Sequence, residues 1–469
     1  MTRMTLDFAW STASDVAAAV NTGAASAYDV TEAALARLAE RNPALNAFTD
    51  VTADRARARA AAIDEAIAAG KAVGPLAGVP FAVKNLFDIA GLSTRAGSKI
   101  NRDRAPATQD APLVARLEAA GAVLFGGLNM GEYAYDFTGE NVHDGPSRNP
   151  HDLSRMTGGS SGGSGGAVAG GLVPLALGSD TNGSIRVPSS LCGLFGLKPT
   201  YGRLSRARSF PFVSSLDHLG PIARTTRDLA LAYDAMQGGD AGDPMTADRP
   251  VEPTMNELDR GTDGLRIAVA GGHFRKGAFP EALAALEQVV RALGISREIE
   301  IPEASRALSA AYVITASEGA SLHLQRLRER SADFDPAVRD RLIAGAMIPF
   351  TYVDRAQKFR RWYRERILEL FDELDAIVAP ATPFTAPLIG QQTFVLDGVE
   401  MPVRSNLGIY TYPISFIGLP AVAVPIPLAP LPIAVQIIVA PWREDLALRI
   451  AQTLETTRTA FAPRPSEKD

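Results

Sequence analysis

The chain has 469 residues, with 47 basic and 52 acidic side chains and a net charge of −5 at pH 7. Because the basic residues are scattered and form no stripe, the composition argues against direct binding of nucleic acid. The single cysteine, Cys192, excludes an intrachain disulfide and a cysteine-based metal centre, and it favours a reducing, cytoplasmic location.

The first part of the chain, residues 11–70, predicts helices. Ser11 or Thr12 can cap the first of them and Ser26 the second. The Ala-rich stretch 52–69 predicts a third helix, which the following glycine would end.

An alternation of strands and helices follows. Leu76–Val83 is apolar and suited to a strand, and it ends at Lys84. Residues 110–121 predict a helix, and Ala122–Phe125 predicts the next strand. This order favours an α/β protein with a largely buried sheet.

The second half begins with a polar stretch rich in Gly, Asp and Pro, residues 237–263, which predicts a surface loop or a boundary between lobes. Residues 264–300 predict strand, helix, strand, and residues 303–375 predict mostly helix. Two stretches that we expect to shape a pocket, 201–213 and 388–406, carry no clear signal.

We expect these segments to form a single domain over residues 1–469. It would consist of a helical segment at about 1–70, a core at about 74–235 and a C-terminal lobe at about 264–460. The last residues, Ala462–Asp469, are expected to be frayed.

No membrane segment or signal peptide is expected. Met1–Trp10 lacks a basic region followed by an apolar core. Gly418–Pro441 is nearly uncharged and long enough to span a bilayer, but its six prolines would break a membrane helix. Two buried strands, Ala421–Val424 and Ile433–Val439, are the preferred interpretation.

Residues 158–166 form a Gly/Ser-rich loop that can bring backbone N–H groups close to a ligand. A phosphate-binding loop is disfavoured because no Gly-Lys-Ser/Thr follows. A flexible linker is disfavoured because the apolar run 167–177 follows directly.

A nucleophile elbow is the alternative interpretation of this loop, since Ser161 and Ser164 each stand at the centre of a G-x-S-x-G match. An elbow also needs a histidine, and His218, His273 and His323 are available. The five histidines form no i, i+4 pair and no H-E-x-x-H, so no metal site is expected.

Two further segments carry chemistry. In Gly178–Arg186, Ser184 follows an Asn-Gly turn, where backbone amides can converge as an oxyanion hole requires. Taken alone, this segment is better explained as an ordinary turn with a solvated serine. Lys84 ends an apolar strand, where burial would lower its pKa and let it act as a base unless its amine reaches solvent.

Taken together, these segments resemble the amidase signature family. The run from Gly158 to Thr200 passes through G-S-D-T-x-G-S-I-R-x-P and C-G-x-x-G-L-K-P-T, and G-V-P-x-x-V-K stands at 78–84. Ser160 and Ser184 keep the interval between the two serines of the family. The resemblance covers nearly the whole chain and implies a mixed β-sheet covered by helices on both faces.

The resemblance also implies a mechanism. Ser184 matches the nucleophile, Ser160 matches the serine that follows a cis peptide bond, and Lys84 matches the general base. No metal and no cofactor is implied. The amides implied for the oxyanion hole, besides that of Ser184, are those of Thr181, Asn182 and Gly183.

Within the family, three segments are similar to two branches, the glutaminase subunit of Glu-tRNA(Gln) amidotransferases and the 1-carboxybiuret hydrolases. They are Thr138–Asn141, Gly145–Pro150 and Ser214–Pro221. A small accessory subunit or a second copy of the chain is the partner that this likeness suggests.

The glutaminase branch binds the substrate carboxylate with an arginine in Q-K-x-R, which Arg360 matches, and the α-ammonium with an aspartate where Gly408 stands. Asn182 replaces a usual glycine of that branch. We therefore expect a small carboxylate-bearing amide or ureide without an α-amino group, such as 1-carboxybiuret, hydrolysed with release of ammonia. A general aliphatic or aryl amidase and a glutaminase subunit are the alternatives. Candidate substrate-binding residues are Arg360, Gly159 and Tyr312.

Overall fold

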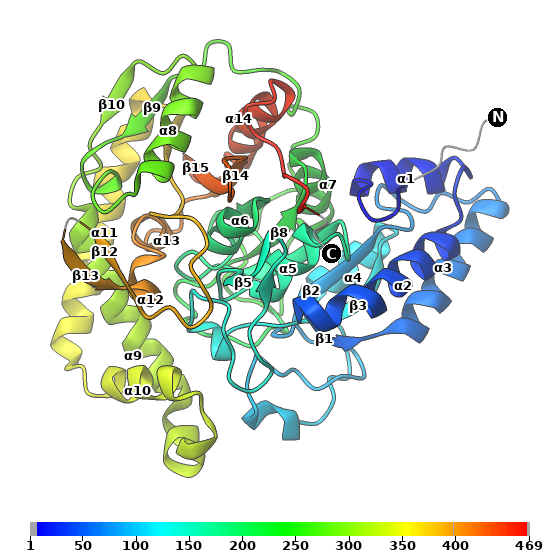
Figure 1. The fold of residues 1–469 in the computed structure, drawn as a ribbon, viewed down its shortest axis with the longest axis horizontal. Coiled ribbons are helices and arrows are strands. Elements are labelled where there is room, and N and C mark those ends of the chain that lie inside the picture. The colour runs from blue at the N-terminus through cyan, green and yellow to red at the C-terminus, as the bar shows by residue number, and fades with distance from the viewer. Residues whose placement is uncertain (1–6, 397, 467–469) are drawn as a thin grey trace.

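A computed structural model describes residues 7–396 and 398–466 of the chain. Within these residues, eleven strands form one sheet that crosses the molecule from the N-terminal helices to α8 (Figure 1). The order of strands is β1 (Phe48–Val51), β3 (Val123–Leu128), β2 (Pro80–Lys84), β6 (Leu175–Ser179), β8 (Leu219–Ala223), β7 (Phe195–Lys198), β14 (Ala421–Ile426), β15 (Ile433–Val439), β11 (Ala376–Pro380), β9 (Ile267–Ala270) and β10 (Arg297–Ile299).

The sheet is mixed, as the family resemblance implied. Strand β2 runs parallel to both β3 and β6, and β9 runs parallel to β10 and β11. The strands from β6 through β8, β7, β14 and β15 to β11 pair antiparallel. Because β8 and β9 belong to one sheet, the polar stretch 237–263 joins two parts of a continuous structure.

Helices cover both faces of this sheet (Figure 1). Helix α5 contacts β2, β6 and β8, while α6 and α14 both contact β14 and β15. The helices packed on the sheet are α4 (Pro112–Ala119), α5 (Gly162–Ala169), α6 (Arg186–Cys192), α7 (Thr226–Met236), α8 (Pro280–Ala292) and α14 (Glu444–Thr456).

The N-terminal helices form as predicted. The Thr12 side chain accepts from the Asp15 amide, and Ser26 Oγ accepts from two amides of the second helix. These bonds satisfy N–H groups that a helix start leaves without a partner. The helices are α1 (Ala13–Asn21), α2 (Ala27–Leu45) and α3 (Ala53–Ala68).

Strand β1 interrupts this predicted helical region. It has four residues and pairs antiparallel with β3, with Phe48 opposite Leu128. So short a run shows no recognisable period of two, and its pairing partner lies far away in the sequence. The prediction of helices alone over residues 11–70 was therefore wrong at this strand.

The strand–helix–strand prediction for 264–300 and the helical prediction for 303–375 are confirmed. Helices α9, α10 and α11 pack together beside the sheet (Figure 1). Their bounds are α9 (Ala304–Arg330), α10 (Pro336–Ala346) and α11 (Phe350–Glu373). Shorter elements are β4 (Arg148–Asn149), β5 (Asp152–Met156), α12 (Val403–Asn406), α13 (Tyr412–Ser415), η1 (Ile100–Asp103), η2 (Glu132–Ala134), η3 (Gly272–Phe274) and η4 (Ser331–Asp333).

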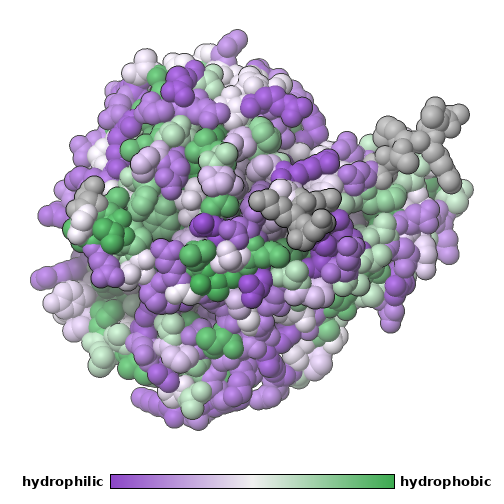
Figure 2. Space-filling model, viewed as in Figure 1, coloured by the Kyte–Doolittle hydropathy of each residue, from purple (hydrophilic) through white to green (hydrophobic). Residues whose placement is uncertain are grey.

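The stretch 388–406, which had no clear signal, contains a hairpin of β12 (Thr393–Leu396) and β13 (Val399–Pro402). Val395 and Val399 are 63% and 60% exposed. Figure 2 shows small apolar areas that interrupt a largely hydrophilic face of the molecule.

The two strands predicted within 418–441 form as β14 and β15, and both are completely buried. No helix within the described residues is long and apolar enough to cross a membrane. The signal-peptide and C-terminal predictions fall partly on residues 1–6 and 467–469, which lie outside the described residues.

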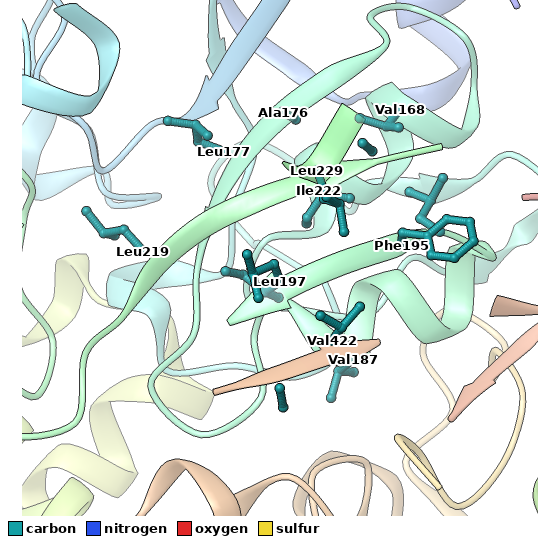
Figure 3. Packing of buried hydrophobic residues seen from close by; sticks show 14 of the residues in the cluster. Val168, Ala176, Leu177, Val187, Phe195, Leu197, Leu219, Ile222, Leu229 and Val422 are labelled. Atoms are coloured by element: carbon teal, nitrogen blue, oxygen red, sulfur yellow. The ribbon is translucent and has the colours of Figure 1, made fainter. Parts of the chain in front are cut away.

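The core beneath the Gly/Ser-rich segments is apolar. Leu177 of β6, Ile222 of β8, Leu197 of β7 and Val422 of β14 are buried on four adjacent strands and belong to one apolar cluster (Figure 3). Each is fully buried, and burial of such a side chain contributes about 1.5–3 kcal/mol. Strand β6 ends two residues after Leu177, so this packing fixes the start of the loop that carries Ser184.

Candidate active site

Lys84 is the last residue of β2, and its side chain is completely buried between β3 and β6. Its Nζ donates to Ser160 Oγ at 2.6 Å and to Ser179 Oγ at 2.9 Å. Burial lowers the pKa of Lys84 to about 7, so a large share of the amine is neutral at pH 7 and can accept a proton. Three carboxylates favour the protonated form and oppose this shift: Asp217, Asp180 and Asp136.

Ser160 lies in the turn between β5 and α5 and is completely buried. The Gly159–Ser160 peptide bond is cis, as the family resemblance implied. A Cβ atom at residue 159 would lie 2.7 Å from the Gly139 nitrogen and 2.8 Å from Asp136 Oδ2. Only glycine therefore fits at this position beside Ser160.

The loop after β6 presents four backbone amides in sequence. The N–H groups of residues 181–184 donate to no acceptor among the described residues. Gly183 has φ +147°, and a Cβ there would lie 2.2 Å from Thr411 Oγ1, so the close approach requires glycine. Thr411 Oγ1 in turn donates to the Asn182 carbonyl at 2.6 Å. Unpartnered amides held in this way are suited to stabilise an oxyanion.

A buried ion pair holds this loop in place. Arg186 and Asp180 are both completely buried, with Arg186 Nε 3.0 Å from Asp180 Oδ2. Burial raises the pKa of Asp180, but the charge and hydrogen bonds of Arg186 outweigh it and lower the pKa to about 2. Arg186 also donates to Gln436 Oε1 at 2.7 Å, which ties the loop to β15. Asp180 is therefore ionised at neutral pH and anchors the residues that follow it.

Ser184 lies at the wall of a small cavity of about 20 Å³ and is 3% exposed. A larger cavity of about 380 Å³ adjoins it, since Ala134 and Phe212 line both. Ser179 lines the larger one, so the Lys84 amine lies behind its wall. The small cavity is lined by Ala134, Tyr135, Asp136, Phe137, Thr181, Asn182, Ser184, Phe212, Arg341 and Tyr412.

Two of the predicted substrate-binding residues, Arg360 and Tyr312, line neither cavity. Arg360 donates to the Phe416 carbonyl at 2.5 Å and to the Ser215 carbonyl at 2.7 Å, and it is not among the described residues that line either cavity. Tyr312 stacks on Tyr412 with ring centroids 4.5 Å apart, so it lies one layer behind the small cavity. In this arrangement Arg360 already has carbonyl partners, and the prediction that it binds a substrate carboxylate stays untested.

The elbow alternative finds no support in the geometry. Ser161 Oγ donates to the Ser179 carbonyl at 3.2 Å and Ser164 Oγ to the Leu177 carbonyl at 2.9 Å. His218 Nδ1 lies 3.0 Å from a backbone carbonyl, and burial lowers its pKa well below the usual value. The described residues contain no group of three or more His, Cys, Asp or Glu suited to hold a metal ion.

Two residues near the proposed site were not predicted from the sequence: Ser179, which contacts Lys84, and Arg341, which lines the same cavity as Ser184. Ser179 stands within the Gly178–Arg186 segment that also holds Ser184, so its place in that segment could have suggested a role. Arg341, on α10, lies in no motif and carries no local signal. Only the packing of α10 against the rest of the chain brings it to the cavity.

Comparison with known proteins agrees with this geometry. A family model described as Amidase matches residues 29–448. The chain belongs to the amidase family. As an amidase, it is a hydrolase that acts on C–N bonds.

Two curated relatives cover almost the whole amidase. The AtzE subunit of 1-carboxybiuret hydrolase from Pseudomonas sp. (strain ADP) is 53% identical over 94% of this chain and 97% of its own length. A glutamyl-tRNA(Gln) amidotransferase subunit of Roseiflexus sp. (strain RS-1) is 39% identical over 95% of this chain and 96% of its own. Both relatives are named as subunits.

Solved structures give the same fold. One, described as a vestigial protein complex that reveals the evolutionary origins of an s-triazine catabolic enzyme, is 52% identical with a TM-score of 0.96 and covers 97% of this chain and all of its own. A 6-aminohexanoate cyclic dimer hydrolase with bound substrate is 28% identical with a TM-score of 0.87, covering 98% of this chain and 99% of its own.

Proposed function

We propose that this amidase hydrolyses a C–N bond of a small carboxylate-bearing ureide or amide, such as 1-carboxybiuret, and releases ammonia. The observation that carries the catalytic part is the buried Lys84 amine, with its lowered pKa, 2.6 Å from Ser160 Oγ. A buried neutral amine is a base, and the Ser160 hydroxyl lies within hydrogen-bond distance of it, so the amine can accept the hydroxyl proton.

The proposed reaction proceeds through an acyl-enzyme. Lys84 takes the proton of Ser160, and Ser160 takes that of Ser184, whose Oγ attacks the substrate carbonyl. The four unpartnered amides of residues 181–184 hold the resulting oxyanion. The proton returns through Ser160 to the departing nitrogen, so that ammonia leaves and a Ser184 ester remains. Water, activated by the same base, hydrolyses this ester.

The proposed substrate class rests on the relatives and on Gly408. The 53% identical relative is a subunit of a 1-carboxybiuret hydrolase, whereas the 39% identical one is a subunit of a glutamyl-tRNA(Gln) amidotransferase. A Cβ atom at residue 408 would lie 2.6 Å from the Phe137 ring, so this ring fills the space that an ammonium-binding aspartate needs. Glutamine would then leave its ammonium unpaired, which is unfavourable.

The test is ammonia release by the purified protein from 1-carboxybiuret, glutamine, biuret, malonamate and aryl amides, with Ser184→Ala as the control. We expect 1-carboxybiuret to be preferred and the activity to disappear in the variant. A preference for glutamine would favour the second candidate, the glutaminase component of an amidotransferase. Activity retained in Ser184→Ala would refute the proposed nucleophile.

The relatives also suggest partners. Because both are named as subunits, we propose that the amidase assembles with a small accessory subunit or with a second copy of itself. Native mass spectrometry of the protein purified from its own cells would identify either assembly, and a purely monomeric species would contradict both.

A further inference from the structure

Arg341 is placed at the small cavity by α10, beside the wall that carries Ser184. Its Nε donates to the Ala337 carbonyl at 2.7 Å, and Nη2 donates to the Tyr135 carbonyl. The guanidinium also lies over the Tyr135 ring, 4.0 Å from its centroid. These contacts leave Nη1 without a partner among the described residues.

This guanidinium has no carboxylate partner among the described residues, although the cavity wall contains a carboxylate. That carboxylate, Asp136, is bonded to Arg404 and to the Thr138 and Gly139 amides. Arg341 is therefore the unpaired charge at the cavity. A cation held against aromatic rings, with donors to spare, is a site for an anion.

Asn182 supplies a second unpaired group on the same wall. Its Nδ2 donates to Thr315 Oγ1 at 2.9 Å, which orients the amide, and its side chain is 4% exposed. Its Oδ1 is buried and has no hydrogen-bond partner. A buried acceptor without a donor is costly, so a ligand that brings an N–H group would relieve it.

We infer that Arg341 and Asn182 together recognise the substrate. The Arg341 guanidinium binds the substrate carboxylate, and Asn182 Oδ1 accepts from an N–H on the acyl side of the scissile carbonyl, opposite the leaving nitrogen. This inference rests on the proposed function and narrows its substrate class to small ureido carboxylates. A plain amide acid offers the carboxylate but no such N–H, and biuret offers the N–H but no carboxylate.

The aromatic wall fits such a ligand. Tyr135, Phe137, Phe212 and Tyr412 line the cavity with rings, which favours a flat ligand. The cavity of about 20 Å³ is smaller than the ligand, so its wall must move to admit one, and Phe212 stands where this cavity adjoins the larger one.

The carboxylate contact is tested with malonamate and malonamide, which differ only in a carboxylate against a carboxamide. For Arg341→Met, we expect the ratio of kcat/KM between them to fall about 10- to 100-fold, mostly through KM for malonamate. Arg341→Lys should restore part of the ratio, since the charge remains without the planar guanidinium. Arg339→Met, on the same helix and paired with Asp340, is the matched control and should leave the ratio unchanged.

The N–H contact is tested with N-carboxyurea and malonamate, which differ in a bridging N–H against CH₂. The wild type should prefer N-carboxyurea, and Asn182→Ala should reduce this preference about 5- to 10-fold. The backbone amide at residue 182 is retained in this variant, so the oxyanion contact stays available.

Labelling of Ser184 by a fluorophosphonate separates failure of the inference from failure of the proposed function. If the variants label normally but both ratios stay at the wild-type values, the recognition inference is overturned and the amidase mechanism survives. If Arg360→Met lowers the malonamate ratio and Arg341→Met does not, Arg360 is the carboxylate ligand and the inference is wrong. If wild type is not labelled and hydrolyses none of the three compounds, the proposed function itself fails.

Discussion

Replacing Lys84 with methionine is expected to abolish hydrolysis and, at neutral pH, to raise the free energy of unfolding. Lys84 is fully buried, and burial lowers its pKa from 10.5 to about 7. At about 1.36 kcal/mol per pKa unit, keeping this amine buried lowers the stability at pH 7 by about 4 kcal/mol. Methionine has a similar length and no charge, so it removes this unfavourable contribution.

The substitution also removes two hydrogen bonds, those from Nζ to Ser160 Oγ and Ser179 Oγ. Leaving two buried hydroxyls without this donor costs about 1–2 kcal/mol each. The expected net stabilisation at pH 7 is therefore about 1 kcal/mol.

The dependence on pH is the sharper prediction. The unfolded chain keeps the Lys84 proton up to about pH 10.5, while the folded protein loses it near pH 7. Between these values the unfolded state binds more protons, so the wild type gains about 1.36 kcal/mol per pH unit from this group. The variant lacks the group, so the stability difference should shift by about 2.7 kcal/mol in favour of the wild type between pH 7.5 and 9.5.

Urea unfolding followed by tryptophan fluorescence, at several pH values, measures this difference. Lys71→Met, at an exposed lysine, is the control and should show no comparable trend. A gap between Lys84→Met and wild type that stays constant from pH 7.5 to 9.5 would show that the folded protein keeps Lys84 protonated, and the proposed base would be lost.

Three further outcomes are expected. The kcat/KM of the wild type should rise with pH around pH 7, as Lys84 becomes neutral. Ser179→Ala should move this rise to lower pH, because it removes a hydrogen-bond acceptor that favours the Lys84 ammonium. If steady-state kinetics show the rise at the same pH in the variant, the contact between Lys84 and Ser179 is contradicted. Asp180→Asn should lower the free energy of unfolding in urea by about 3–5 kcal/mol, because Arg186 would stay buried without its counter-ion. A loss under about 1 kcal/mol would refute the role of Asp180 as the anchor of the loop. The double variant Gly408→Asp, Phe137→Ala should hydrolyse glutamine faster than either single variant, because removal of the Phe137 ring makes room for the aspartate side chain at residue 408. Equal rates in all three variants would show that residue 408 does not face the substrate.

Much of the fold could be predicted because its signals are local. The caps at Thr12 and Ser26, the proline-interrupted strands at β14 and β15 and the long helices near residues 303–375 each follow from a short pattern. Strand β1 and the β12–β13 hairpin were missed, because four-residue strands carry almost no periodicity and form only when a partner strand is present.

The sequence by itself located the segments on which the proposed chemistry rests, because their signals depend on spacing along the chain. Lys84 at the end of an apolar run and the two serines in the Gly-rich run from Gly158 to Thr200 predict a serine hydrolase with a lysine base through their resemblance to the amidase signature family.

The tertiary structure alone decided which side chains face Ser184. Arg360 and Arg341 both lie on long helices of the same region, and their surroundings in the sequence do not separate them. Which helix face meets the cavity depends on how α9, α10 and α11 pack against each other and on the strands they cover. A substrate pocket is made by side chains far apart in the chain, so its charge and its unpaired groups become visible only once the helices are packed.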